Sequence, residues 1–66
     1  MMVLVEGRQF NWREGMTVAD LLREVGDPYP YAVVRIHDRV VSRPDFENVT
    51  VPRGSEVYLI PLIAGG

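Results

Sequence analysis

The first residues of the chain carry the pattern of two short strands. "MVLVE" at residues 2–6 is rich in residues that favour β-structure, and Gly7–Arg8 supplies a turn after it. In "QFNW", which follows, apolar and polar residues alternate, so that Phe10 and Trp12 share one face. The two segments are predicted to form a β-hairpin.

A helical period replaces the strand pattern in "TVADLLREVG" at residues 17–26. Its apolar residues recur at i, i+3, i+4 and i+7 and form one core-facing stripe, made of Val18, Leu21, Leu22 and Val25. Thr17 and Asp20 have the spacing of a capping box, and Gly26 can adopt the left-handed conformation that closes a helix. Pro28 then prevents continuation. This segment is predicted to be a helix.

Strand signals return after the proline-rich connection "DPYPY". "AVVRIH" at residues 32–37 is predicted to form a third strand, Asp38–Arg39 a tight turn, and residues 40–41 a short return strand. Pro44 prevents ladder pairing, so "SRPDF" crosses over, and "NVTV" at residues 48–51 is a candidate edge strand. A turn at 52–55 leads into a last strand over residues 56–63.

The resulting order, β-β-α-β-β, predicts an α+β fold in which a mixed sheet packs on one helix. The first and last strands are expected to be the longest and to lie side by side in the middle of the sheet. With 66 residues, 47% of them apolar, the chain is expected to be a single domain spanning residues 1–66, with a tail from about residue 62 to 66.

The last strand is expected to have one buried and one open face, because neighbouring side chains in a strand point to opposite sides. A single helix covers only one face of the sheet, and we assign Val57 and Leu59 to that face. The open face is predicted to carry Tyr58, Ile60, Leu62 and, from the first strand, Leu4. An exposed apolar patch is typical of a partner surface. The alternative is that Leu62 and Ile63 fold back and cover it.

The composition offers little for catalysis or metal binding. There is no cysteine, and the one histidine, His37, lies beside a predicted turn, where a solvated or capping role is expected. Ser42 and Ser55 lack a base in an activating motif, and the nine acidic residues are spread singly. Phosphate-binding loops and metal-ligand spacings are absent from the sequence. We therefore expect a protein that is not an enzyme and binds no cofactor or metal.

Charge and hydropathy exclude further classes. The seven basic residues, all arginine, are scattered, and the net charge is −2, so nucleic-acid binding is not expected. Apolar runs are too short to span a membrane, and no signal peptide opens the chain. Because the lack of cysteine fits a reducing compartment, we expect a cytoplasmic protein without a membrane partner.

The terminal Gly65–Gly66 follows an apolar strand directly. Glycine gives the backbone access to narrow spaces, so this end could enter a channel and present its carboxylate in another protein's active site. Near neutral pH that carboxylate is an anion and a poor electrophile. Chemistry on it requires activation, most simply by ATP as an acyl adenylate. An amine would then give a conjugate, and a sulfur donor a thiocarboxylate.

The strand order, the length, "VVSRPDF" at residues 40–46 and the ending "LIPLIAGG" resemble the ThiS/MoaD group of ubiquitin-like sulfur carriers over nearly the whole chain. The resemblance implies a β-grasp fold. It also implies that an E1-like adenylating enzyme of the ThiF/MoeB type, using ATP and Mg²⁺, adenylates Gly66, and that a persulfide sulfur donor converts the product to a thiocarboxylate. Gly65, Ala64 and Ile63 would lie in the enzyme's channel, and Ile60 would anchor the partner.

Two members of the group fit different parts of the chain. "IHDRVVSRPDF" resembles the thiamine carrier, although Ser-Arg-Pro stands where a Pro-Arg order is usual, whereas "YLIPLIAGG" is closer to the small subunit of molybdopterin synthase. We favour the thiamine carrier, whose acceptor would be thiazole synthase; the other acceptor would be the molybdopterin synthase large subunit. A carrier of another sulfur pathway, a ubiquitin-like protein modifier and a non-covalent β-grasp interaction module remain as alternatives.

Overall fold

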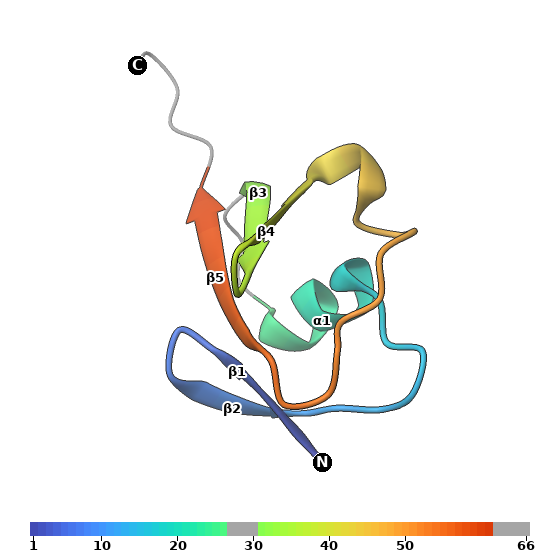
Figure 1. The fold of residues 1–66 in the computed structure, drawn as a ribbon, viewed down its shortest axis with the longest axis vertical. Coiled ribbons are helices and arrows are strands. Elements are labelled where there is room, and N and C mark those ends of the chain that lie inside the picture. Colours follow the sequence, from blue (N-terminus) through green and yellow to red (C-terminus); the bar gives the residue numbers. More distant parts are fainter. Residues whose placement is uncertain (27–30, 62–66) are drawn as a thin grey trace.

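The computed structural model describes residues 1–26 and 31–61 (Figure 1). Pro28 and the expected tail, Leu62, Ile63, Ala64, Gly65 and Gly66, lie outside the described residues. The elements are β1 (Met2–Val5), β2 (Arg8–Asn11), α1 (Val18–Val25), β3 (Tyr31–Ile36), β4 (Arg39–Ser42), the 3₁₀ turn η1 (Arg43–Asp45) and β5 (Glu56–Pro61). The strand order β2-β1-β5-β3-β4, with β1 and β5 parallel and the other pairs antiparallel, confirms the mixed sheet.

The first hairpin turns one residue earlier than predicted. Glu6 and Gly7 occupy the turn with φ angles of 50° and 83°, and β2 already begins at Arg8. Two central residues with positive φ are the requirement of the type I′ turn, whose twist matches that of the flanking strands. Phe10 and Trp12 are half-buried and pack against the core, as their alternation predicted.

The helix begins and ends as the sequence predicts. The Thr17 hydroxyl accepts a hydrogen bond from the Asp20 amide at 3.1 Å, and the Asp20 carboxylate accepts one from the Thr17 amide, also at 3.1 Å. Gly26 ends the helix with a φ of 70°, in the left-handed region, and its amide donates to the Leu22 carbonyl. The capping box and the glycine cap are therefore both confirmed.

The second half of the chain differs from the prediction at two places. The turn between β3 and β4 is formed by His37 and Asp38 rather than by Asp38–Arg39. Residues 48–51 do not form a strand and make only one isolated bridge, between Thr50 and Thr17. The reason is that these residues pair with the segment that enters α1 and not with the sheet: the Val51 amide donates to Met16 and the Val18 amide to Val49.

One hydrophobic core lies between the sheet and α1. Its sheet residues are Val3, Val5, Val34, Ile36, Val41, Val57 and Leu59, and the other members are Met16, Val18, Leu21, Phe46 and Val51. β5 is the middle strand and β1 lies beside it, as predicted, but β1 has only four residues while β3 and β5 have six each. In the described part of the chain, no helix is long and apolar enough to cross a membrane.

Candidate functional site

The side chains of β5 alternate between the core and solvent. Val57 is 1% exposed and Leu59 9%, whereas Tyr58 is 38% exposed and Ile60 44%. These values confirm the assignment of the two faces made from the sequence. β5 therefore presents an aromatic and an aliphatic side chain to solvent immediately before the carboxyl-terminal residues 62–66.

Strands on both sides of β5 extend this surface. Ile60 lies opposite Val33 of β3, Tyr58 lies opposite Arg35, and Arg35 lies opposite Val40 of β4. Directly opposed residues in a sheet share a face and can interact. On the other side, Leu4 of β1, predicted to belong to the patch, is half-buried and lies opposite Glu56. We call the set Leu4, Val33, Arg35, Val40, Tyr58 and Ile60 the open sheet face.

The sequence prediction missed three members of this face: Val33, Arg35 and Val40. Val40 is 60% exposed, more than Tyr58 or Ile60. The signal that could have revealed it is the hairpin turn, because a turn at His37–Asp38 places Val40 opposite Arg35. A turn at Asp38–Arg39 would place Val40 opposite His37, two residues from Arg35 and on the same face, so the predicted turn shifts the pairing without exchanging the faces of β4.

A cation and an anion flank the Tyr58 ring on the open sheet face. The Arg35 guanidinium lies 4.7 Å from the ring centroid, in the range of a cation–π interaction. The Tyr58 hydroxyl donates to the Glu56 carboxylate at 3.4 Å, a long hydrogen bond. The Arg35 side chain forms no hydrogen bond or ion pair with any described residue. Its N–H donors are therefore available to a group outside the chain.

Side chains also bond to the backbone near the end of β5. The Leu59 amide donates to the Glu6 carboxylate at 3.2 Å. Arg43 donates from Nε and Nη2 to the Tyr31 carbonyl, at 3.1 and 3.0 Å, and Tyr31 lies opposite Pro61. These contacts come from residues that the sequence prediction assigned no role.

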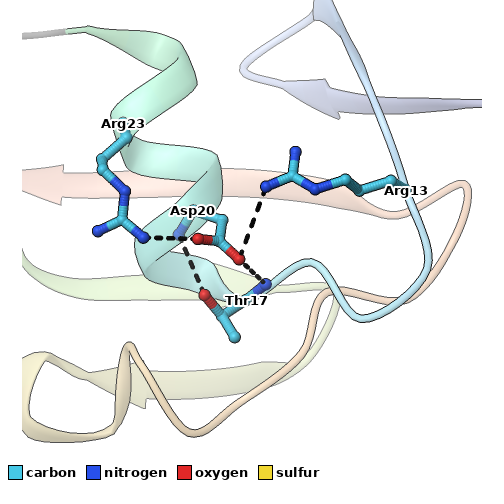
Figure 2. Close-up of polar contacts among 4 residues, drawn as sticks. All are labelled: Arg13, Thr17, Asp20 and Arg23. Carbon is cyan, nitrogen blue, oxygen red and sulfur yellow. Dashed lines mark hydrogen bonds and ion pairs between the residues drawn. The ribbon is translucent and has the colours of Figure 1, made fainter.

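A separate cluster of charges surrounds Asp20 at the start of α1, as Figure 2 shows. The backbone hydrogen bond from Thr17, together with that from the Arg23 side chain at 2.5 Å, holds the pKa of the Asp20 carboxyl below its ordinary value of 3.8. Arg13 approaches the same carboxylate at 3.9 Å. Because each of these contacts favours the ionised carboxylate beside the helix N-terminus, we assign the cluster to helix stability.

The other polar residues considered from the sequence lie in turns. Ser55 is fully buried, and its hydroxyl donates to the Pro52 carbonyl, which closes the turn before β5. His37 is exposed in the β3–β4 turn with a φ of 56°. Among residues 1–26 and 31–61, no group of three or more histidine, cysteine or acidic side chains could hold a metal ion.

Comparison with known proteins places this geometry in a family. The family model described as "ThiS family" matches residues 3–66. A crystal structure of the thiamine biosynthesis protein ThiS from Geobacter metallireducens is similar over the full length of both chains, with a TM-score of 0.76 and 25% sequence identity. Proteins of this family are sulfur carriers and not enzymes. The match covers nearly every residue, including the last strand and the two terminal glycines, and the chain belongs to the ThiS family.

Proposed function

We propose that this chain is the sulfur carrier of thiamine biosynthesis, in which the carboxylate of Gly66 becomes a thiocarboxylate that supplies sulfur to thiazole synthase. The observation that carries the proposal is the family match through residue 66, because it includes Gly65–Gly66. The similar protein from Geobacter metallireducens is described as a thiamine biosynthesis protein, which supports this pathway over the alternatives.

Activation begins at the terminal carboxylate, which is an anion near neutral pH, as α-carboxyl groups ordinarily are. A carboxylate oxygen attacks the α-phosphorus of ATP, pyrophosphate leaves, and an acyl adenylate forms. An E1-like adenylating enzyme of the ThiF/MoeB type provides the site, with Mg²⁺ neutralising the phosphate charges. The carrier contributes the carboxylate and the surface by which the enzyme holds it.

Sulfur transfer follows at the carbonyl carbon of the adenylate. The terminal sulfur of a persulfide donor attacks that carbon and AMP leaves, which gives an acyl persulfide. A thiol then attacks the donor-side sulfur of the S–S bond, forms a disulfide with the donor and releases the thiocarboxylate. The two electrons for this reduction come from the thiols. The thiocarboxylate is a sulfur nucleophile that thiazole synthase can accept.

The chain's own residues divide between docking and delivery. Ile60 and Tyr58, with Leu4, form the patch on which the adenylating enzyme docks, because exposed apolar side chains favour association. Leu62, which the sequence assigns to the same patch, lies outside the described residues. Ile63, Ala64 and Gly65 pass through the enzyme's channel, and the lack of a side chain at Gly65 permits close approach of the backbone next to Gly66. Gly66 is the residue that is modified.

A second candidate is the small subunit of molybdopterin synthase, which the ending "YLIPLIAGG" favours. The activation chemistry is the same, and only the acceptor differs: the large subunit of molybdopterin synthase replaces thiazole synthase. A carrier of another sulfur pathway would likewise differ at the acceptor. A protein modifier would transfer the same acyl group to a lysine amine.

The experiment is mass spectrometry of the protein from its native host, with fragmentation of the carboxyl-terminal peptide. We expect sulfur in place of one oxygen at Gly66. The thiocarboxylate form is then supplied separately to thiazole synthase and to the molybdopterin synthase large subunit, and loss of sulfur only with thiazole synthase supports the thiamine pathway. A carboxylate that stays unmodified with the adenylating enzyme, ATP and a sulfur source would contradict the proposal and favour an inert interaction module.

A further inference from the structure

The strand that leads to the carboxyl terminus extends beyond its neighbour β1. In the parallel ladder, the Leu4 amide donates to Ser55 and the Glu6 amide donates to Val57. The next bond of such a ladder would run from the Leu59 amide to the backbone carbonyl of Glu6. The chain turns at Glu6–Gly7, and the Glu6 carboxylate accepts that bond at 3.2 Å. A side chain thus continues the ladder where the strand ends.

On the other side of the β3–β5 pair, the Arg43 side chain bonds to the backbone of β3 beyond the end of β4. β4 ends at Ser42, and the next residue, Arg43, begins the 3₁₀ turn η1. Its guanidinium donates through two nitrogens to the carbonyl of Tyr31, the first residue of β3. A guanidinium can make this two-pronged contact because its donors lie in a rigid plane. Tyr31 lies opposite Pro61, the last described residue before the tail.

The polarity of each side chain matches the backbone group that it meets. An acid accepts from an amide and an arginine donates to a carbonyl, and charged partners make the stronger hydrogen bonds. Both residues directly follow a flanking strand, Glu6 after β1 and Arg43 after β4. The two contacts lie on either side of the end of the β3–β5 pair, near the point where residues 62–66 begin. Figure 1 shows β5 rising past β1 toward that point.

We propose that Glu6 and Arg43 are positioning residues that fix the direction in which the carboxyl-terminal tail leaves β5. This inference rests on the proposed function, because it concerns delivery of the Gly66 carboxylate to the adenylating enzyme. The enzyme docks on the open sheet face, and the carboxylate must then reach ATP at a fixed distance from that face. Holding the end of β5 keeps the reacting atoms close to their productive geometry, which is where positioning lowers a barrier.

The test is the rate of pyrophosphate release from ATP by the host's adenylating enzyme, measured with Glu6→Ala and Arg43→Ala carriers. We expect kcat to fall about tenfold in each variant with KM for the carrier unchanged, since the side chains of the open sheet face are left intact. Glu6→Gln retains an acceptor oxygen and should keep most of the activity. Amide hydrogen exchange at Leu59 should become faster in Glu6→Ala and stay near the wild-type rate in Glu6→Gln.

The matched controls are Arg39→Ala and Glu47→Ala, which remove exposed side chains of the same types that have no hydrogen bond or ion pair among the described residues. Both should behave as wild type. Unchanged kcat in Glu6→Ala and Arg43→Ala, or a rise in KM alone, would overturn the inference. If the wild-type carrier itself releases no pyrophosphate, the proposed function fails instead, so the two failures are distinguishable.

Discussion

Two adjacent residues of β5, Leu59 and Ile60, lie on opposite faces of the sheet. Leu59 is 9% exposed and belongs to the core, whereas Ile60 is 44% exposed on the open sheet face. Both are branched aliphatic side chains of the same size, so their environments alone decide what each contributes. The pair therefore offers a direct test of whether the open sheet face acts in binding and the other face in stability.

Ile60→Arg should weaken binding to the adenylating enzyme without unfolding the domain, because a charge on an exposed position meets solvent in the free carrier but an apolar surface in the complex. Leu59→Ala should lower the free energy of unfolding by about 2–5 kcal/mol, the usual cost of truncating a core leucine. Chemical denaturation and titration calorimetry measure the two effects. If Ile60→Arg melts early but still binds, the roles of the two faces are reversed.

At the scale of elements, the helix is held at its start by charges around Asp20. The Thr17 amide and the Arg23 guanidinium lower the pKa of this carboxyl below 3.8. A depressed pKa means that the folded state favours the ionised form, so the contribution is present above pH 3.8 and is lost as the pH falls through the folded pKa. Stability should therefore depend on this residue near neutral pH and not in strong acid.

Asp20→Asn should lower the melting temperature near neutral pH, since it removes the charge that Arg23 and the helix N-terminus stabilise. The difference from wild type should shrink when both are measured well below pH 3.8. Glu24→Gln removes a charge from the same helix without disturbing any hydrogen bond or ion pair among the described residues, and should show no such pH-dependent difference. If Asp20→Asn lowers the melting temperature by the same amount at both pH values, the charge of the carboxylate does not contribute to stability.

The open sheet face spans four strands, and it carries a charge, Arg35, that the sequence prediction overlooked. The Arg35 guanidinium lies over Tyr58 and has no anionic partner among the described residues. If a partner covers the face, this cation loses water, and an unpaired charge in an interface is costly. The adenylating enzyme should therefore place a carboxylate against Arg35.

Arg35→Glu should reduce the association rate with the adenylating enzyme, and the effect should diminish at higher salt, because exposed charges act through a screened field. The control is Arg39→Glu, which makes the same charge change in the β3–β4 hairpin but lies opposite Ile36, a residue of the buried face. Stopped-flow binding measures both. If the association rate falls equally in the two variants, the net charge of the carrier decides the rate and the location of Arg35 does not.

The sequence predicted correctly those elements whose boundaries depend on residues close to one another in the chain. The helix was correct to its caps because Thr17, Asp20 and Gly26 act within a few residues of one another. The first turn was misplaced because Glu6 is an unusual residue at positive φ, and its carboxylate meets Leu59, more than fifty residues away in the chain. No local pattern contains that contact. The same holds for residues 48–51, which are of β-forming types but whose backbone pairs with the segment that enters the helix instead of the sheet.

The candidate site was predicted in part for the same reason. Alternation along β5 was enough to find Tyr58 and Ile60, which the structure confirms as exposed. Val33, Arg35 and Val40 depend on how β3 and β4 align with β5, and that alignment changes faces with a shift of one residue. The roles assigned to Gly65 and Gly66 remain predictions, because they lie outside the described residues.

At the scale of the whole molecule, stability and chemistry occupy different parts of the chain. The described core extends from Val3 to Leu59 and includes the covered face of every strand except the edge strand β2. The proposed chemistry belongs to Gly66. The domain is therefore expected to remain folded without residues 62–66. Adenylation of Gly66 is expected to require the folded domain.

A chain truncated after Pro61 should keep the melting temperature of the full-length protein to within a few degrees, since a 1 kcal/mol change would shift it by about 4–8 °C in a domain of this size. It should lose adenylation completely. Deletion of Gly66 alone is the control and should give the same two results. A large fall in melting temperature on truncation would support the alternative that Leu62 and Ile63 cover the open sheet face.

The position of β5 has a consequence for how the protein is made on the ribosome. The middle strand of the sheet is the last described element to be translated, and it pairs with β1, one of the first. Until it emerges, the β1–β2 hairpin and the β3–β4 hairpin have no strand to join them. Folding of this sheet must therefore wait until β5 has been translated, and pairing across so long a stretch of chain is slow. During that interval the nascent chain exposes the apolar faces and unpaired edges of both hairpins, the surfaces that make a partly folded chain prone to aggregation.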